Sequence, residues 1–185
     1  MTIDGPLEVV DYDPNWPIMF EHERHRIDQA LGPLLHDIEH VGSTSIPGLA
    51  AKPIIDMQLV VLTFNGLPRC IEQMTKLGYT YLGTYGIEGR EYFKRLGFHA
   101  HMVQINNDEF SRKRLFLEHL RTHPDARAEY AALKKHLADK WAAHPDALQR
   151  YNLGKTDFIM GALTAAGWDP ERRPQYLKDS SNVIH

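Results

Sequence analysis

The chain has 185 residues, 43% of them hydrophobic, and this is enough to bury one sizeable core. Its formal net charge of −3 argues against the uniform attraction to phosphate that drives non-specific binding to long nucleic acid. The single cysteine, Cys70, cannot form an internal disulfide, and its expected position on a helix favours a small buried thiol. We therefore expect one compact unit and do not expect nucleic acid as a partner.

Neither a membrane anchor nor a secretory signal is predicted. The longest apolar run, residues 54–62, contains Asp56 and Gln58 and is far shorter than the roughly 20 residues that cross a bilayer. Residues 1–6 lack the basic and apolar regions of a signal peptide. We expect a cytoplasmic protein with no membrane partner.

The first part of the chain predicts two strands with a helix between them. Residues 7–11 resemble a short strand, and the Asp-Pro-Asn of residues 13–15 has the capping side chains and early proline of a helix start. Apolar residues then recur at helical spacing until the Gly-Pro of residues 32–33. Residues 38–41 predict the second strand, which leads into a loop at residues 42–48.

The middle of the chain predicts the remaining strands. Residues 54–61 are almost continuously aliphatic, as in a strand covered on both faces, and they are the best candidate for the middle of the sheet. Residues 67–77 have helical spacing, and residues 79–85 return to an extended pattern. Residues 91–96 and 98–105 predict a hairpin.

The second strand of this hairpin alternates between polar and apolar side chains. His99 and His101 fall on one face, and Ala100 and Met102 fall on the other. The two histidines could act as general acid and base, bind phosphate, or hold a transition metal together with Asp56. They could equally be an exposed pair without a function, because two histidines under-fill a metal shell.

The C-terminal part is predicted to be helical. We expect helices near residues 109–121, 125–141 and 146–166, the last capped by Gly167, and a tail at residues 169–185 that is poorly ordered or lies on the surface.

These elements divide the chain into three segments. Residues 1–107 would form an α+β core, residues 108–168 would form helices packed on that core, and residues 169–185 would be the tail.

The loop and the strand after it carry the residues best suited to phosphate chemistry. Gly42 lets the backbone approach a phosphate. Three consecutive residues then offer hydroxyl and amide donors to its oxygens: Ser43, Thr44 and Ser45. Asp56, on a strand otherwise too apolar to explain it, could hold Mg²⁺ together with substrate phosphates.

A purely structural interpretation of both features is also open. The Gly-Ser loop could be a turn with local capping bonds, and Asp56 could be a buried carboxylate bonded by backbone amides or by Lys52. However, a lone acid on such an apolar strand costs on the order of several kcal/mol unless it is paired or metal-bound. The combination of loop and acid therefore favours a phosphate site.

Cations near this strand could neutralise phosphate charge. Lys52 lies just before the strand, and Arg90, Lys94 and Arg95 surround the predicted hairpin. We take Lys52 and Lys94 as the phosphate-binding candidates. Lys155, in the Gly-Lys-Thr of residues 154–156, is set aside, because the motif lacks the upstream glycine of a P-loop and falls within a predicted helix.

The long run of residues 38–56, preceded by the Tyr-Asp-Pro-Asn-Trp-Pro of residues 12–17, resembles the GrpB family. The likeness continues through the Glu-Tyr-Phe-Lys of residues 91–94 and the His-Ala-His of residues 99–101 into the helical region, and it covers residues 7–166. That family is uncharacterised and is similar to a domain fused to some dephospho-CoA kinases.

The resemblance implies a nucleotidyltransferase-like fold, in which a mixed β-sheet flanked by helices is followed by a C-terminal helical segment. In such folds a Gly-Ser turn follows one strand, and metal-binding carboxylates lie on the next. Gly42 and Ser43 match the turn, and Asp56 matches the first carboxylate. Gln58 stands at the second carboxylate position, where its amide can bond Mg²⁺-bound water but adds no negative charge. The third position, on the strand of residues 98–105, offers histidines instead.

We therefore hypothesise a nucleotide-dependent transferase, which uses a nucleoside triphosphate and Mg²⁺ for nucleotidyl transfer to a small-molecule acceptor or for its adenylation. The predicted catalytic residues are Asp56, His99 and His101, and the predicted metal ligands are Asp56 and Gln58. The predicted nucleotide- and phosphate-binding residues are Gly42, Ser43, Thr44, Ser45, Lys52 and Lys94.

Two other functions stay open. One is a non-catalytic module that binds a nucleotide or a coenzyme-A-related ligand, which Gln58 in place of an acid favours. The other is a metal-dependent hydrolase built on Asp56, His99 and His101. The sequence specifies neither the preferred base, nor the acceptor, nor the oligomeric state.

Overall fold

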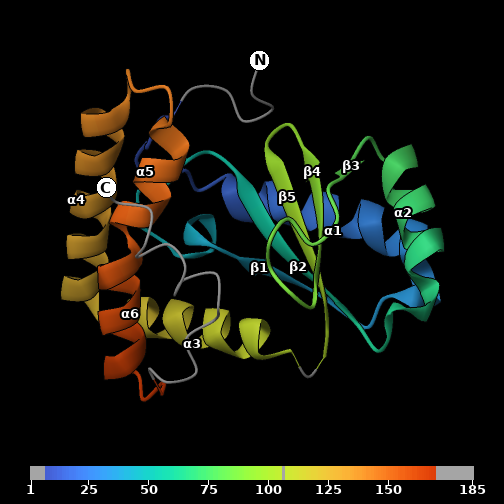
Figure 1. The fold of residues 1–185 in the computed structure, drawn as a ribbon. Helices are drawn as coiled ribbons and strands as arrows, with labels where there is room; N and C mark the ends of the chain where they lie inside the picture. Colours follow the sequence, from blue (N-terminus) through green and yellow to red (C-terminus); the bar gives the residue numbers. More distant parts are fainter. Residues whose placement is uncertain (1–6, 106, 170–185) are drawn as a thin grey trace.

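The computed structural model describes residues 7–105 and 107–169, and within them five strands form one mixed sheet (Figure 1). The strands are β1 (Asp37–Val41), β2 (Ile55–Val61), β3 (Thr80–Tyr81), β4 (Arg90–Arg95) and β5 (Phe98–Gln104), and their order is β1-β2-β5-β4-β3. β2 and β5 are parallel, and the other neighbouring pairs are antiparallel. The prediction that residues 54–61 form the middle strand was wrong, since β5 holds that position and β2 lies beside it.

The described helices are α1 (Trp16–Leu31), α2 (Leu67–Lys76), α3 (Asp108–Thr122), α4 (Pro124–Trp141), α5 (Ala147–Gly154) and α6 (Thr156–Ala165). Short 3₁₀ turns occur at Gly32–Leu34, Ser43–Ser45 and Phe64–Gly66. The helices α3 to α6 gather at one side of the sheet, and α2 lies at the other (Figure 1). Among the described residues, no helix combines the length and apolarity that a membrane crossing needs.

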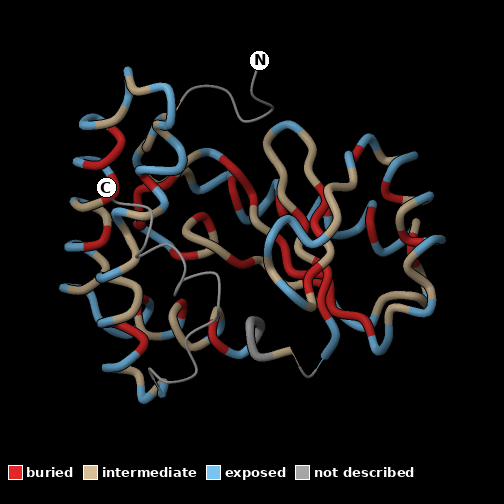
Figure 2. The backbone as a smooth tube through the Cα atoms, in the orientation of Figure 1, coloured by how far each residue is buried: buried red, intermediate tan, exposed pale blue. Residues whose placement is uncertain are grey.

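One face of the sheet carries the main hydrophobic core. The side chains of Met57, Leu59, Ala100 and Met102 are 0% exposed and share a cluster with residues of α1 and α2. Cys70 on α2 belongs to this cluster, which confirms that the thiol is buried. The buried segments of β2 and β5 run through the centre of the molecule in Figure 2.

The opposite face carries the polar side chains in two parallel rows. Because paired residues of neighbouring strands share a face, the register fixes both rows. The first row runs across four strands as Lys94, His99, Asp56 and Val41. The second row runs beside it as Tyr92, His101, Gln58 and Glu39. The predicted alternation of β5 is thereby confirmed.

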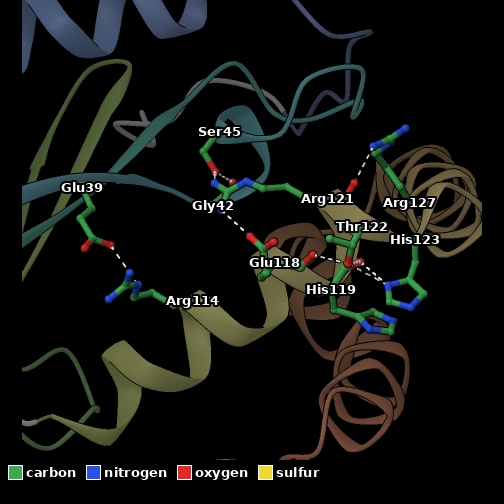
Figure 3. Close-up of polar contacts among 10 residues, drawn as sticks. All are labelled: Glu39, Gly42, Ser45, Arg114, Glu118, His119, Arg121, Thr122, His123 and Arg127. Carbon is green, nitrogen blue, oxygen red and sulfur yellow. Dashed lines mark hydrogen bonds and ion pairs between the residues drawn. The ribbon is translucent and has the colours of Figure 1, made fainter.

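The C-terminal helices are attached to this polar side through the loop after β1. An apolar cluster joins Val41, Ile46 and Leu49 to Leu117, Leu120 and Tyr130 of α3 and α4. Polar contacts supplement it (Figure 3): Arg121 Nη2 donates to Ser45 Oγ at 3.3 Å, and Arg114 lies 3.8 Å from Glu39. The buried Lys134 of α4 donates to the carbonyl of Ala50. The helices therefore fix both ends of the loop.

Two predicted strands are much shorter than expected. Only Val10 of residues 7–11 pairs, in a single bridge with Ala51, because Leu7 and Val9 pack instead against the helices α4 and α5. The strand predicted at residues 79–85 is limited to Thr80–Tyr81, since the chain after it adopts positive φ angles that end the extended conformation.

The predicted helix of residues 146–166 is in fact two helices, α5 and α6, which meet at Lys155. Gly154 packs so closely on α4 that a Cβ there would lie 2.6 Å from Leu137 Cδ2. Gly167 has a φ of +86° and follows the end of α6, as predicted for a C-cap glycine. Residues 170–185 of the predicted tail lie outside the described residues, and the division of the chain at residues 107 and 108 stays a prediction.

Candidate functional site

The centre of the site is the contact between Gly42 and Asp56. Gly42 follows the last residue of β1 and has a φ of +74°, and Asp56 is the second residue of β2. A Cβ at position 42 would lie 2.5 Å from Asp56 Oδ2, so that only glycine leaves room for the carboxylate. The predicted loop and the predicted acid are thus in direct contact.

Both predicted histidines reach the same carboxylate. His99 Nδ1 lies 3.4 Å from Asp56 Oδ1, and His101 Nε2 lies 3.5 Å from the same oxygen. Burial acts to raise the pKa of Asp56, but the hydrogen bonds from His101 and His99 outweigh it and hold this pKa well below its usual value. Asp56 is therefore an ionised carboxylate at neutral pH.

His101 is fixed in one neutral form. Its Nδ1 lies 3.5 Å from Arg90 Nη1, and because a guanidinium only donates, Nδ1 accepts and the ring proton is on Nε2, which faces Asp56. Burial, followed by the positive charge of Lys113, lowers the pKa of His101 to about 3. His101 thus contacts Asp56 through one ring nitrogen and Arg90 through the other.

Aromatic contacts orient the two imidazoles. The ring of Tyr92 stacks on His101 with 5.0 Å between centroids, and it lies edge-on to His99 at 5.5 Å. The guanidinium of Arg90 lies 5.0 Å from the centroid of the same ring. Since Tyr92 is only 6% exposed, these contacts form a packed wall beside Asp56.

Lys155, which we set aside on the sequence, belongs to the site. The break between α5 and α6 directs its Nζ to Asn152 Oδ1 at 3.0 Å and over the Tyr151 ring at 4.1 Å, with Lys52 Nζ 6.0 Å from the same ring. Burial, followed by repulsion from Lys52, lowers the pKa of Lys155 to about 7. The signal for this arrangement was Gly154, which marks the end of a helix rather than part of a phosphate loop.

Two adjoining cavities open around Asp56. The smaller, of about 280 Å³, is lined by the cations Lys52, Lys94 and Lys155 together with Ser43 and both histidines. The larger, of about 830 Å³, shares Asp56, His101 and Lys155 with it and extends between α3 and α6. Its walls there are mainly apolar: Phe116, Leu117, Leu120, Ile159 and Met160. A molecule that occupies both cavities would expose a polar part to the lysines and an apolar part to the helices.

The hydroxyls of Thr44 and Ser45 serve the loop itself. Thr44 is 1% exposed, donates to the carbonyl of Ile54 at 3.2 Å and contacts His40 Nε2 at 3.0 Å. Ser45 donates to the carbonyl of Gly42 at 2.7 Å while it accepts the bond from α3 (Figure 3). Both residues shape the turn over Asp56, and a phosphate contact from either hydroxyl stays a prediction.

The residues offer one carboxylate for a metal, not two. Gln58 follows Asp56 on the same face but is 0% exposed, and neither polar atom of its side chain has a hydrogen-bond partner among the described residues. Within residues 7–105 and 107–169, no group of three His, Cys, Asp or Glu residues is arranged to hold a metal ion. Asp56 fits one Mg²⁺ that brings phosphate ligands with it, and the amide of Gln58 adds no negative charge for a two-metal clamp. A hydrolase site of Asp56 and the histidines stays a prediction.

Comparison with known proteins identifies relatives across most of the chain. A family model described as GrpB protein matches residues 6–165. The UPF0157 protein YqkA of Bacillus subtilis is 42% identical over 160 residues, which are 84% of this chain and 46% of YqkA. A dephospho-CoA kinase of Mycolicibacterium paratuberculosis is 28% identical over 71% of this chain and 39% of the kinase. The chain thus spans less than half of these two relatives.

Solved structures agree on the fold. The crystal structure of the conserved protein GrpB from Enterococcus faecalis superposes with a TM-score of 0.79 and 35% identity, over 86% of this chain and 96% of that one. The Cid1 poly(U) polymerase with bound MgGTP superposes with a TM-score of 0.51 and 15% identity, over 70% of this chain and 44% of Cid1. The second likeness concerns the fold alone, and it makes the sheet and helices nucleotidyltransferase-like, as predicted.

Proposed function

Because the chain belongs to the GrpB family and has a nucleotidyltransferase-like fold, we propose that it is a nucleotide-dependent transferase that modifies a small molecule by nucleotidyl transfer or adenylation. The observation that carries the proposal is the ionised Asp56 beneath Gly42, at the wall shared by a lysine-lined cavity and an apolar one. The first cavity suits a polyphosphate, and the second suits the body of an acceptor.

The phosphates of the nucleotide would bind in the smaller cavity. Lys52, Lys94 and Lys155 enter it from three different segments of the chain, so that they can contact a triphosphate from several sides. Ser43 lines the same cavity and offers its hydroxyl to a phosphate oxygen. The negative charge of Asp56 would repel the α-phosphate unless a cation lies between the two groups. An acid among the lysines therefore favours binding of the phosphates together with a metal ion.

Asp56 is the residue that would hold Mg²⁺. When bound, a divalent ion would supply positive charge that offsets the negative charge of the phosphates during transfer. Gln58 is too deeply buried to replace a second carboxylate, and Lys155 and Lys52 supply positive charge on the phosphate side instead. We expect one metal ion per nucleotide.

The reaction would form a bond between an acceptor oxygen and the α-phosphorus and break the bond from that phosphorus to pyrophosphate. If the acceptor is a hydroxyl, its proton would go to His99, whose ring lines the smaller cavity beside Asp56. If the acceptor is a carboxylate, it is already ionised and needs no base. The apolar wall of the larger cavity is compatible with either kind of acceptor.

Isothermal titration with ATP, GTP, CTP and UTP, each with Mg²⁺ and with EDTA, tests the proposal. We expect at least one nucleotide to bind in a metal-dependent way and Asp56→Asn to weaken that binding by about tenfold or more, as loss of a ligand-shell group usually does. The control Asp139→Asn makes the same change on the exposed side of α4 and should bind like the wild type. Metal-dependent binding that survives Asp56→Asn would contradict the proposal.

The second candidate is a non-catalytic module that binds a nucleotide or a coenzyme-A-related ligand. The buried amide of Gln58 at the second acid position favours it, as does the similarity to dephospho-CoA kinases. This function predicts equal nucleotide affinity with Mg²⁺ and with EDTA, and no release of pyrophosphate when small acceptors are added.

A further inference from the structure

Tyr85 combines a strained backbone with an exposed aromatic ring. Its φ is +47°, and it is the one residue other than glycine with a positive φ in the described part of the chain. A bulky side chain rarely adopts this conformation, because its Cβ approaches the backbone too closely. The residue is nevertheless 67% exposed, so that burial of the ring does not compensate for the strain.

A buried arginine holds this conformation in place. Arg90, which is 6% exposed, donates from Nη2 to the carbonyls of Thr84 at 3.0 Å and Tyr85 at 3.1 Å, and from Nε to the carbonyl of Thr84 at 3.3 Å. The same guanidinium contacts His101. The turn that presents Tyr85 is therefore built on the group that also orients the site. Strain that is held in this way, at the edge of a site, points to a role in function rather than in stability.

The ring of Tyr85 lies at the outer end of an aromatic series that leads to Asp56. Its centroid is 5.4 Å from that of Tyr92, with 41° between the planes, and Tyr92 stacks in turn on His101. Tyr85 lines both cavities together with Asp56. A planar group that enters beside the lysines would thus meet an exposed ring that is fixed before binding.

We propose that Tyr85 is a specificity-determining residue, whose ring stacks on the base of the nucleoside triphosphate while the phosphates lie at Lys52 and Lys155. This inference rests on the proposed function and specifies it, because it makes the base itself part of what the site recognises. Stacking tolerates every base, since each has a π-face, so that the residue would select nucleotides over simple polyphosphates rather than one base over another.

The experiment compares ATP with inorganic tripolyphosphate, both with Mg²⁺, on the wild type and on three variants. Tyr85→Leu keeps bulk but removes the ring, and we expect it to lose ATP affinity by about five- to 150-fold, the usual range for a stacked base, with tripolyphosphate affinity unchanged. Tyr85→Phe should bind both ligands like the wild type. Tyr85→Gly should lose ATP affinity as Tyr85→Leu does, while its melting temperature stays the same or rises, because glycine accepts the positive φ.

For Tyr85→Gly we expect a lower ATP affinity without a loss of thermal stability. This combination distinguishes a role in recognition from a role in stability. The inference is overturned if the wild type binds ATP but Tyr85→Leu and Tyr85→Gly bind it equally well, or if the wild type does not distinguish ATP from tripolyphosphate. In both cases the proposed function stands. A wild type that binds neither tripolyphosphate nor any of the four nucleoside triphosphates would instead overturn the proposed function, and the inference with it.

Discussion

The two faces of the sheet are made by the same strands and serve different purposes. On one face, Met57 of β2 and Ala100 of β5 pack against α1 and α2 without exposed surface. On the other face, their neighbours Asp56 and His99 contact one another and line open cavities. A step of one residue along either strand therefore leads from the core to the site.

This difference explains how the chain can tolerate a site that lowers its folding stability. A charged carboxylate and three lysines around cavities contribute little to folding, because their charges must be desolvated and the space between them is unfilled. The opposite face supplies the hydrophobic burial that stabilises both. Position on the sheet face, more than residue type, should then decide whether a substitution affects stability or binding.

Adjacent substitutions on β4 should give the largest contrast. Phe93 is 0% exposed on the packed face, and Phe93→Ala should lower the free energy of unfolding by about 3–5 kcal/mol, the usual cost of removing a core phenylalanine. Lys94→Ala changes the next residue, which lines the smaller cavity, and should cost less than about 1 kcal/mol while it weakens nucleotide binding. Urea unfolding measures the free energy of unfolding of both variants. Similar losses of stability would break the distinction between the faces.

Two glycines of one loop sharpen the comparison at the site itself. Gly42 and Gly48 have φ angles of +74° and +78°, but an added Cβ meets Asp56 only at Gly42 and nothing within 4 Å at Gly48. Each change to alanine should cost about 1–2 kcal/mol through backbone strain alone. Only Gly42→Ala should also displace the carboxylate and abolish metal-dependent nucleotide binding. Equal binding by the two variants, measured by titration, would show that the contact does not matter.

Substitution of Lys155 should have the smallest effect on ligand affinity, and this effect should depend on pH. Lys155→Met should weaken tripolyphosphate binding about tenfold at pH 6, as expected for loss of a hydrogen bond to a charged group. The matched change Lys140→Met, beside Trp141 on α4, should have no effect. Since the pKa of Lys155 is lowered to about 7, wild-type affinity should fall as the pH rises from 7 to 9, and this fall should be absent from Lys155→Met.

The same group has the opposite effect on stability. Between pH 7 and the ordinary lysine value of 10.5, the unfolded chain binds the proton that folded Lys155 has released. The free energy of unfolding should therefore rise with pH over this interval, and more steeply in the wild type than in Lys155→Met. A fall in stability with pH that depends on Lys155 would contradict the assignment.

Local patterns predicted most of the fold and the centre of the site. The alternation of β5 specified which of its side chains share a face, and parallel pairing with β2 then brings Asp56 beside His99. The register between distant segments has no such local signal. For this reason the sequence did not identify β5 as the middle strand, nor reveal that Lys155 and Lys52 both lie near the ring of Tyr151.

The missed features share a physical cause. Leu7 and Val9 alternate as in a strand, but they bury their side chains against helices, and alternation alone does not distinguish the two partners. The strain at Tyr85 is likewise imposed by bonds from Arg90, and the sequence around it predicts only a turn. The sequence therefore did not predict residues whose positions depend on tertiary contacts, and it did predict residues whose positions follow from strand alternation.

The most direct test of the account is to locate the metal–nucleotide complex by nuclear magnetic resonance. Titration with Mn²⁺-ATP, referenced to Mg²⁺-ATP, should broaden the ring signals of His99 and His101, which contact Asp56, and should spare those of the exposed His22 and His25 on α1. This result would locate the nucleotide on the polar face. Broadening confined to histidines away from Asp56, or no difference between the two metals, would contradict the central claim.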